Sequence, residues 1–146
     1  MKENVNELER KIEEEAVKEF GINYGSAKAL DIKEVSGKKI LPIAVYKNRD
    51  HGIDPAVVRI EFYEIGRVLT EHLKTVNLEY NRPSRRFHYV FPRIKLTDID
   101  GKLEAEIEIV NSQYIGFRLP FGNRYEREVL GSVTEKLSGE GWMAIK

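Results

Sequence analysis

The dipeptide Asp100-Gly101 most constrains the fold of this chain, because alternating apolar and charged residues flank it on both sides. Asp-Gly is a preferred two-residue turn between antiparallel strands. Counting outward from the turn places Leu96 opposite Ala105 and Ile94 opposite Ile107 on one face. The other face then carries three polar or charged pairs: Thr97 with Glu104, Lys95 with Glu106 and Arg93 with Glu108. Turn, pattern and charge agree, so the sequence predicts an antiparallel hairpin in this register.

Two further strands follow from the same alternation. Extending the first strand backward places Phe87, Tyr89 and Phe91 on the face of Arg93 and Lys95, unless a bulge at Pro92 reverses that assignment. Residues 114–121 are predicted to form the next strand. We expect its inward side chains to be Ile115, Phe117 and Leu119, and its outward residues to be Tyr114, Gly116 and Arg118.

Three segments have apolar spacing that favours helices. The first runs from Asn4 or Asn6 to Phe20, and its narrow apolar stripe could also dock another subunit. The second begins at Asp54-Pro55, a cap followed by a first-turn proline, and runs to about Thr75. The third is capped by Asn123, and its stripe consists of Tyr125, Val129, Val133 and Leu137.

A first hairpin and a final strand complete the predicted order. Ser36-Gly37 is the predicted turn, with Glu34 paired to Lys39, and this register also pairs Ile32 with Leu41 and Leu30 with Ile43. Residues 142–145 form a short strand or a docked tail. The order is then α-ββ-α-βββ-α-β. We expect an α+β fold, one domain over residues 1–146, with a mostly antiparallel sheet and helices packed on one face.

Composition narrows the possible functions. The chain has no cysteine, which excludes disulfides, cysteine zinc sites, iron–sulfur ligation and thiol nucleophiles. Its net charge is zero, whereas a non-specific coat for nucleic acid is basic overall. Neither a signal peptide nor an apolar run of about 20 residues is present. We expect a cytoplasmic protein without a membrane partner, or a viral or phage protein within a cell.

The arginines indicate a binding surface. Seven of the 11 Arg lie between Tyr80 and Arg127, interleaved with aromatic residues. Arginine grips phosphate with two parallel hydrogen bonds, and bases stack on exposed aromatic rings. The sequence therefore predicts a ligand site around residues 80–93 and 114–118. Phosphate would be held by Arg82, Arg85, Arg86 and Arg118, and a base would stack on Phe87, Tyr89 and Tyr114.

The leading hypothesis is thus a non-catalytic protein, with no cofactor, that binds a nucleotide, a nucleotide-derived signal or single-stranded nucleic acid. The opposing interpretation places the aromatics in the core under a helix, with the arginines paired to Glu104, Glu106 and Glu108. The second hypothesis is a structural or interaction protein, a homo-oligomer or virion-type component, that uses the first helix and a sheet edge.

A metal-dependent hydrolase is the third hypothesis. In the 48–54 loop, Asp50, His51 and Asp54 are possible ligands of a divalent metal. Glu61 and His72 interrupt the apolar face of the predicted second helix. Helix geometry puts them three turns apart, roughly 16 Å, so they are not expected to act as a pair. We expect structural roles for both, with Glu61 near an arginine and His72 on a backbone group.

Overall fold

The computed structural model describes residues 2–49 and 53–137. One helix and eight strands occur in that part of the chain. The helix, α1, spans Lys2–Phe20 and is confirmed, beginning somewhat earlier than predicted. The strands are β1 (Gly25–Ala29), β2 (Lys33–Val35), β3 (Lys38–Lys47), β4 (Ala56–Ile65), β5 (Thr70–Asn77), β6 (His88–Ile99), β7 (Lys102–Arg118) and β8 (Gly122–Lys136). Within these residues no helix is long and apolar enough to cross a membrane.

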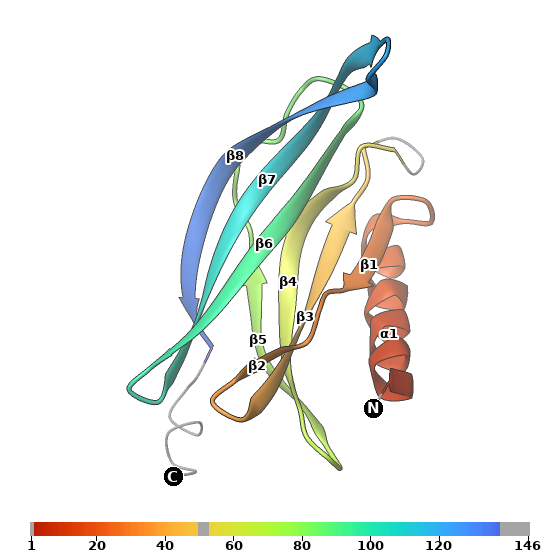
Figure 1. The fold of residues 1–146 in the computed structure, drawn as a ribbon. Coiled ribbons are helices and arrows are strands. Elements are labelled where there is room, and N and C mark those ends of the chain that lie inside the picture. The colour runs from red at the N-terminus through yellow and green to blue at the C-terminus, as the bar shows by residue number, and fades with distance from the viewer. Residues whose placement is uncertain (1, 50–52, 138–146) are drawn as a thin grey trace.

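The strands form two antiparallel groups that are joined at one point (Figure 1). In the first group β3 pairs with β1, β2 and β4, and β4 pairs with β5. In the second group β7 pairs with β6 and β8. A parallel bridge between β4 and β6 links the groups through the single pair Ala56 and Val90. There the Val90 N–H donates to the Pro55 carbonyl at 3.0 Å.

Two clusters of buried side chains hold these layers together. The larger lies between the two groups of strands and contains Phe62 from β4, Ile107 from β7 and Ile40 from β3. The smaller lies between α1 and the opposite face of the first group, where Ile12 and Ala16 pack near Leu41, Ile43 and Val45. Both faces of β3 are therefore covered, which explains why residues 40–46 are a continuous apolar run.

The expectation of an α+β fold with several helices is wrong, because both later helices are strands. Residues 56–77 form the β4–β5 hairpin, and residues 122–136 form β8. A spacing of four residues places side chains on one face of a helix, but also on one face of a strand, since four is even. The β-branched and aromatic residues of 56–65 favour a strand. The molecule is mostly sheet, with one helix in the described residues.

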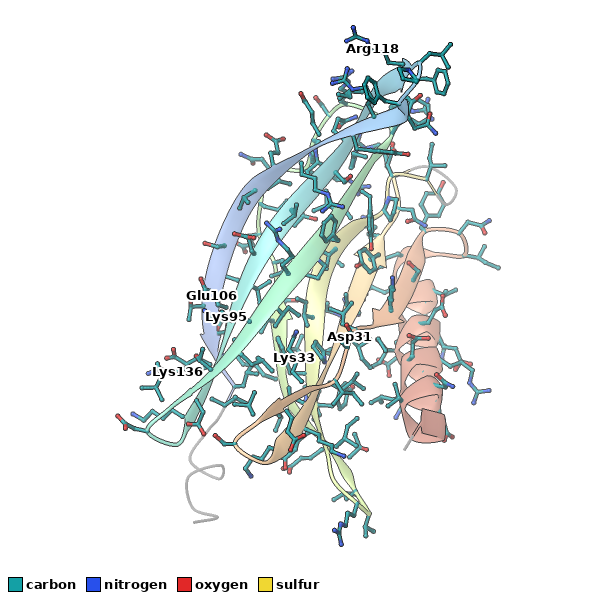
Figure 2. All side chains as sticks on the ribbon, viewed as in Figure 1. Asp31, Lys33, Lys95, Glu106, Arg118 and Lys136 are labelled. Carbon is teal, nitrogen blue, oxygen red and sulfur yellow. The ribbon has the colours of Figure 1, made fainter. Side chains whose placement is uncertain are left out.

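The hairpin at Asp100-Gly101 has the predicted register at every pair. Both turn residues have positive φ, as this two-residue turn requires. The ladder continues to His88 without a bulge at Pro92, so Tyr89 and Phe91 do share the face of Arg93 and Lys95. Figure 2 shows Lys95 beside Glu106, its partner on β7.

Other strand predictions need correction. Glu34 does pair with Lys39. Ala29 rather than Leu30 lies opposite Ile43, and the Leu30 N–H donates to the Pro42 carbonyl, so that predicted pair is wrong by one residue. The predicted pair of Ile32 with Leu41 does not form, because Ile32 lies between β1 and β2. Residues 114–118 belong to β7, and the chain turns at 119–121. The predicted inward side chains Phe117 and Leu119 are exposed at this turn. The predicted final strand at 142–145 lies outside the described residues.

Candidate functional site

Six aromatic side chains from four strands and one loop form two neighbouring sets of ring contacts, which we call the aromatic face: Tyr46, Phe87, Tyr89, Phe91, Tyr114 and Tyr125. Tyr46 is its buried member. Tyr114 has its ring centroid 6.5 Å from that of Phe87 and 5.6 Å from that of Tyr125, its cross-strand neighbour. Tyr89 lies 5.7 Å from Tyr46 and stacks on Phe91 at 5.3 Å. Helix α1 packs elsewhere, against β1 and β3, and the aromatic face is open at Phe87 and Tyr125, which are 63% and 58% exposed.

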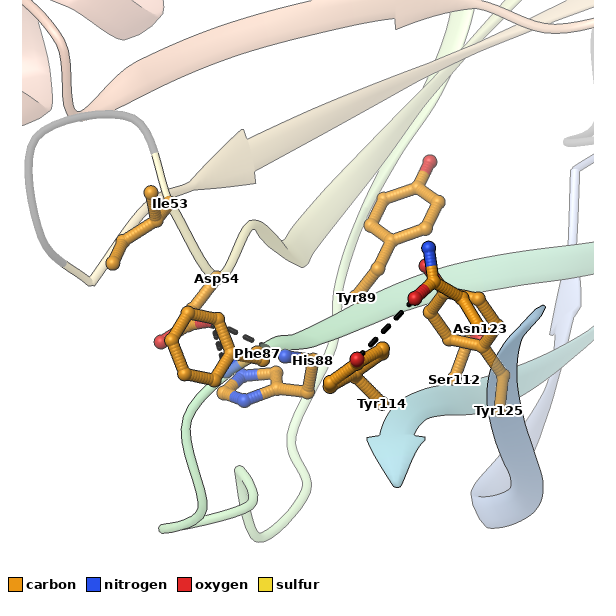
Figure 3. A pocket seen from close by; sticks show the side chains of 9 residues that line it. All are labelled: Ile53, Asp54, Phe87, His88, Tyr89, Ser112, Tyr114, Asn123 and Tyr125. Carbon is orange, nitrogen blue, oxygen red and sulfur yellow. Dashed lines mark hydrogen bonds between the residues drawn. The ribbon is translucent and has the colours of Figure 1, made fainter. Parts of the chain in front are cut away.

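A hollow of about 540 Å³ opens in this face, and we call it the larger hollow (Figure 3). The rings of Phe87, Tyr114 and Tyr125 form much of its wall. The Tyr114 hydroxyl donates to Asn123 Oδ1 at 3.3 Å, which ties the walls from β7 and β8 together. The remaining lining residues are Ile53, Asp54, His88, Tyr89 and Ser112. Flat apolar walls with a few polar groups are typical of small-molecule sites.

Asp54 is the buried acid of the larger hollow, with 3% of its surface exposed. Its Oδ1 accepts from the backbone N–H of Phe87 at 2.7 Å and from that of His88 at 3.1 Å. These bonds hold Phe87 at a φ of 61°, which non-glycine residues seldom adopt. The prediction that Asp54 caps a helix is therefore wrong, because a strand follows it and its carboxylate accepts from N–H groups of a loop distant in the sequence. Its Oδ2 is buried and has no hydrogen-bond partner among the described residues.

His88 is a neutral hydrogen-bond acceptor beside this acid. Its Nδ1 lies 2.7 Å from the Arg85 carbonyl, which can only accept, so Nδ1 carries the proton. In the neutral ring Nε2 is then the acceptor, and Arg82 Nε approaches it at 3.5 Å. Burial lowers the pKa of His88. The ring is therefore neutral near pH 7 and presents a lone pair rather than a charge.

A smaller hollow of about 340 Å³ adjoins the larger one, because Tyr89 and Ser112 line both. It contains two cationic side chains, Lys28 from β1 and Arg127 from β8, and the described residues that line it include no acid. The Arg127 guanidinium lies 5.7 Å from the Phe91 ring centroid. The larger hollow has the opposite character, with Asp54 and no Lys or Arg among its lining residues. The two hollows thus offer a carboxylate at one end and cations at the other.

A phenol pair closes the smaller hollow. The hydroxyls of Tyr46 and Tyr89 lie 3.0 Å apart. Burial, and then this bond to Tyr89, raise the pKa of Tyr46 well above its usual range. Tyr46 therefore remains a neutral phenol at physiological pH, and adds no negative charge near Lys28 and Arg127.

The predicted stacking residues Phe87, Tyr89 and Tyr114 do lie together in the larger hollow. The predicted arginines are dispersed. The Arg86 guanidinium is 5.7 Å from the Phe87 ring centroid, whereas Arg82 donates to the Asp54 carbonyl.

The other two arginines lie farther from the rings. Arg85 lines a separate hollow with Asn111 and Gln113, whose positions alternate with those of Ser112 and Tyr114 on β7. Figure 2 shows Arg118 at the tip of the β7–β8 hairpin.

Several residues of the two hollows were not predicted from the sequence. Asn123, Tyr125 and Arg127 alternate along β8, a signal that the helical interpretation of this segment concealed. Lys28 and Tyr46 reach the site through the pairing of β1 with β3, with Ser26 opposite Tyr46. No local pattern in the sequence predicts that pairing.

Glu61 lies opposite Thr75, and His72 lies opposite Tyr63, on the paired strands β4 and β5, so the predicted separation of roughly 16 Å is wrong. His72 Nε2 lies 3.2 Å from Glu61 Oε1, so His72 contacts a side chain rather than the predicted backbone group. The Thr75 hydroxyl donates to the same oxygen. As predicted, an arginine lies near Glu61: Arg59 Nε is 3.7 Å from its Oε2. Arg59 also pairs with Glu19 of α1 at 2.8 Å, which points to a structural role in seating the helix.

The hydrolase hypothesis depends on Asp50 and His51, which lie outside the described residues. Asp54 is committed to backbone N–H groups. In the rest of the chain, residues 2–49 and 53–137, no group of three potential metal-binding side chains occurs. The geometry therefore adds no support to a metal site.

No protein-family model matches this chain, and no curated protein or solved structure does either. A functional proposal must therefore rest on the geometry of the two hollows.

Proposed function

We propose that this is a non-catalytic binding protein for a ligand that contains both a ring and a phosphate, such as a nucleotide or single-stranded nucleic acid. The ring stacks in the larger hollow, and the phosphate lies against Lys28 and Arg127 in the smaller one. The observation that carries this proposal is a hollow walled by aromatic rings, open at Phe87 and Tyr125, that adjoins a second hollow lined by Lys28 and Arg127.

The energetics are adequate for such a ligand. Stacking of a base on an aromatic side chain contributes about 1–3 kcal/mol. The Arg127 guanidinium can form two parallel hydrogen bonds to a phosphate, and Lys28 adds a compact charge. Arg86, beside Phe87, remains a second candidate for a phosphate contact, as the sequence predicted. Arg82 contributes mainly by holding the Asp54 backbone.

Binding measurements on matched variants test the proposal. Calorimetric titrations would use nucleoside monophosphates and short single-stranded oligonucleotides at two salt concentrations. Tyr125→Ala and Arg127→Ala should each weaken binding about tenfold or more. Arg124→Ala is the control, because Arg124 lies on the same strand three residues away and its side chain points to the other face.

The salt dependence separates the two contacts. Loss of Arg127 should reduce the dependence of oligonucleotide affinity on salt, whereas loss of Tyr125 should leave that slope unchanged. The proposal is wrong if nothing in the panel binds, or if Arg124→Ala weakens binding as much as Arg127→Ala does.

A second candidate function is a structural or interaction role. Three apolar side chains at the tip of the β7–β8 hairpin are exposed: Phe117, Leu119 and Phe121. Such a cluster is typical of a contact with another protein. Among the described strands β8 is also at the edge of its sheet, where it can pair with another chain. The apolar stripe of α1, in contrast, is used within the molecule.

Light scattering distinguishes this second candidate. The wild-type protein should form an oligomer, and the triple change Phe117→Ser, Leu119→Ser and Phe121→Ser should dissociate it without loss of strand content in circular dichroism. If the wild-type protein is monomeric at all concentrations and binds nucleotides, the first proposal is favoured over the second.

A further inference from the structure

We propose that the larger hollow selects a ring with an exocyclic amino group, as in cytosine, adenine or guanine, and that Asp54 accepts the hydrogen bond from it. This inference rests on the proposed function, since it concerns the same site. It adds the chemical identity of the ring, which the stacking residues alone leave open because every base has a π-face.

The first observation is the unused oxygen of Asp54. The side chain is almost fully buried, Oδ1 receives two backbone N–H groups, and Oδ2 has no partner among the described residues. A buried carboxylate oxygen without a donor costs free energy, which a ligand donor recovers on binding. The described lining of the hollow supplies no Lys or Arg for this purpose. We therefore expect the ligand to supply the missing hydrogen-bond donor.

The second observation is that the neighbouring ring is already satisfied within the protein. His88 donates its Nδ1–H to the Arg85 carbonyl, and its Nε2 accepts from Arg82 Nε at 3.5 Å. Asp54 and His88 both line the larger hollow (Figure 3). Asp54 Oδ2 is therefore the acceptor that remains for a ligand in this part of the hollow, and an amino group supplies an N–H donor to it. The carboxylate disfavours a base that presents a carbonyl oxygen at the same place, because like partial charges would face each other.

The third observation is that the ring beside Asp54 is largely exposed. The Phe87 backbone N–H is bonded to Asp54 Oδ1, and 63% of the surface of Phe87 is exposed. Its contact with Tyr114 is an edge contact at 6.5 Å rather than a close stack. Rotation of the Phe87 side chain would let a flat ligand enter between these two rings and reach Oδ2.

Pairs of nucleotides that differ at one group test the inference. Cytidine monophosphate is compared with uridine monophosphate, and adenosine monophosphate with inosine monophosphate. Each pair exchanges an amino group for a carbonyl oxygen and keeps sugar and phosphate the same. The amino-bearing member should bind about tenfold to a hundredfold more tightly, as expected for a hydrogen bond to a charged group.

Asp54→Asn is the decisive variant. Asn keeps an oxygen for the Phe87 and His88 N–H groups and replaces Oδ2 by an amino donor. The preference should therefore invert, with uridine and inosine monophosphates bound more tightly. If this variant does not fold, the two wild-type pairs still decide the question by themselves.

The outcomes separate this inference from the proposed function. Equal affinity within each pair, with all four nucleotides weakened by Tyr125→Ala, would overturn the amino selectivity and leave the proposed function standing. If none of the four nucleotides binds and the single-stranded oligonucleotides do not bind either, both are overturned. Tighter binding of the carbonyl-bearing members by the wild-type protein would also overturn the selectivity.

Discussion

Replacement of Gly25 by alanine should destabilise the protein through a clash between backbone atoms. A Cβ at Gly25 would lie 2.2 Å from the Ala16 carbonyl oxygen and 2.5 Å from its carbonyl carbon. Carbon and oxygen normally approach to about 3.3 Å, so α1 and β1 must separate by about 1 Å. Neither side can yield by a rotamer change, because the obstacle is helix backbone. The cost should lie near the upper end of overpacking penalties, about 3 kcal/mol.

The assay is thermal and urea unfolding followed by circular dichroism. For a chain of this size, about 3 kcal/mol lowers the melting temperature by roughly 6–12 °C. The matched control is Gly131→Ala on β8, where an added Cβ meets nothing within 4 Å. That change should be neutral or slightly stabilising. Equal melting temperatures for the two variants would refute the argument that close contact with α1 requires glycine at position 25.

Three further predictions concern single groups. Burial lowers the pKa of His88 below 6.5, so near pH 6.5 the unfolded chain binds more protons than the folded chain. The free energy of unfolding should therefore decrease as the pH falls through 6.5, and urea titrations of His88→Gln should not show this decrease. The Tyr80 hydroxyl donates to the Val57 carbonyl at 2.5 Å, and burial raises the pKa of Tyr80 to about 12. Tyr80→Phe should lower the free energy of unfolding in urea by about 1 kcal/mol and remove one phenol that titrates at high pH from the ultraviolet titration. The exposed pair Arg93–Glu108, at 2.5 Å, should have a coupling of no more than about 1 kcal/mol in a double-mutant cycle.

The parts of the fold that could be predicted are those set by local signals. The Asp100-Gly101 turn and its flanking charges determined one register completely. The segments 54–75 and 123–137 could not be assigned from spacing, because steps of four residues fit a strand as well as a helix. Tyr125 and Val129 illustrate this, whereas the register shift next to Val129 turns Val133 to the core face. Gly66, which falls within the predicted second helix, lies in the β4–β5 turn at residues 66–69.

The candidate site was predicted in part for the same reason. Phe87, Tyr89 and Phe91 alternate within one segment, so their common surface can be inferred from the sequence alone. Lys28 and Arg127 come from strands about 100 residues apart in the chain, which lie together only after both groups of strands have formed. The buried state of Asp54 likewise depends on a loop 33 residues away.

The single bridge between Ala56 and Val90 has a consequence for how the chain is divided. Apart from that pair, every ladder among the described strands lies either within residues 25–77 or within residues 88–136. A break in the segment 78–87 leaves both ladders whole. The contacts that it separates are the shared core and side-chain hydrogen bonds, such as that from the His88 N–H to Asp54. Two fragments cut there should therefore recognise each other mainly through side chains rather than through strand pairing. The test is whether the native circular dichroism spectrum is recovered when the fragments are mixed. Failure to recover it would mean that the two parts fold together only when they are covalently linked.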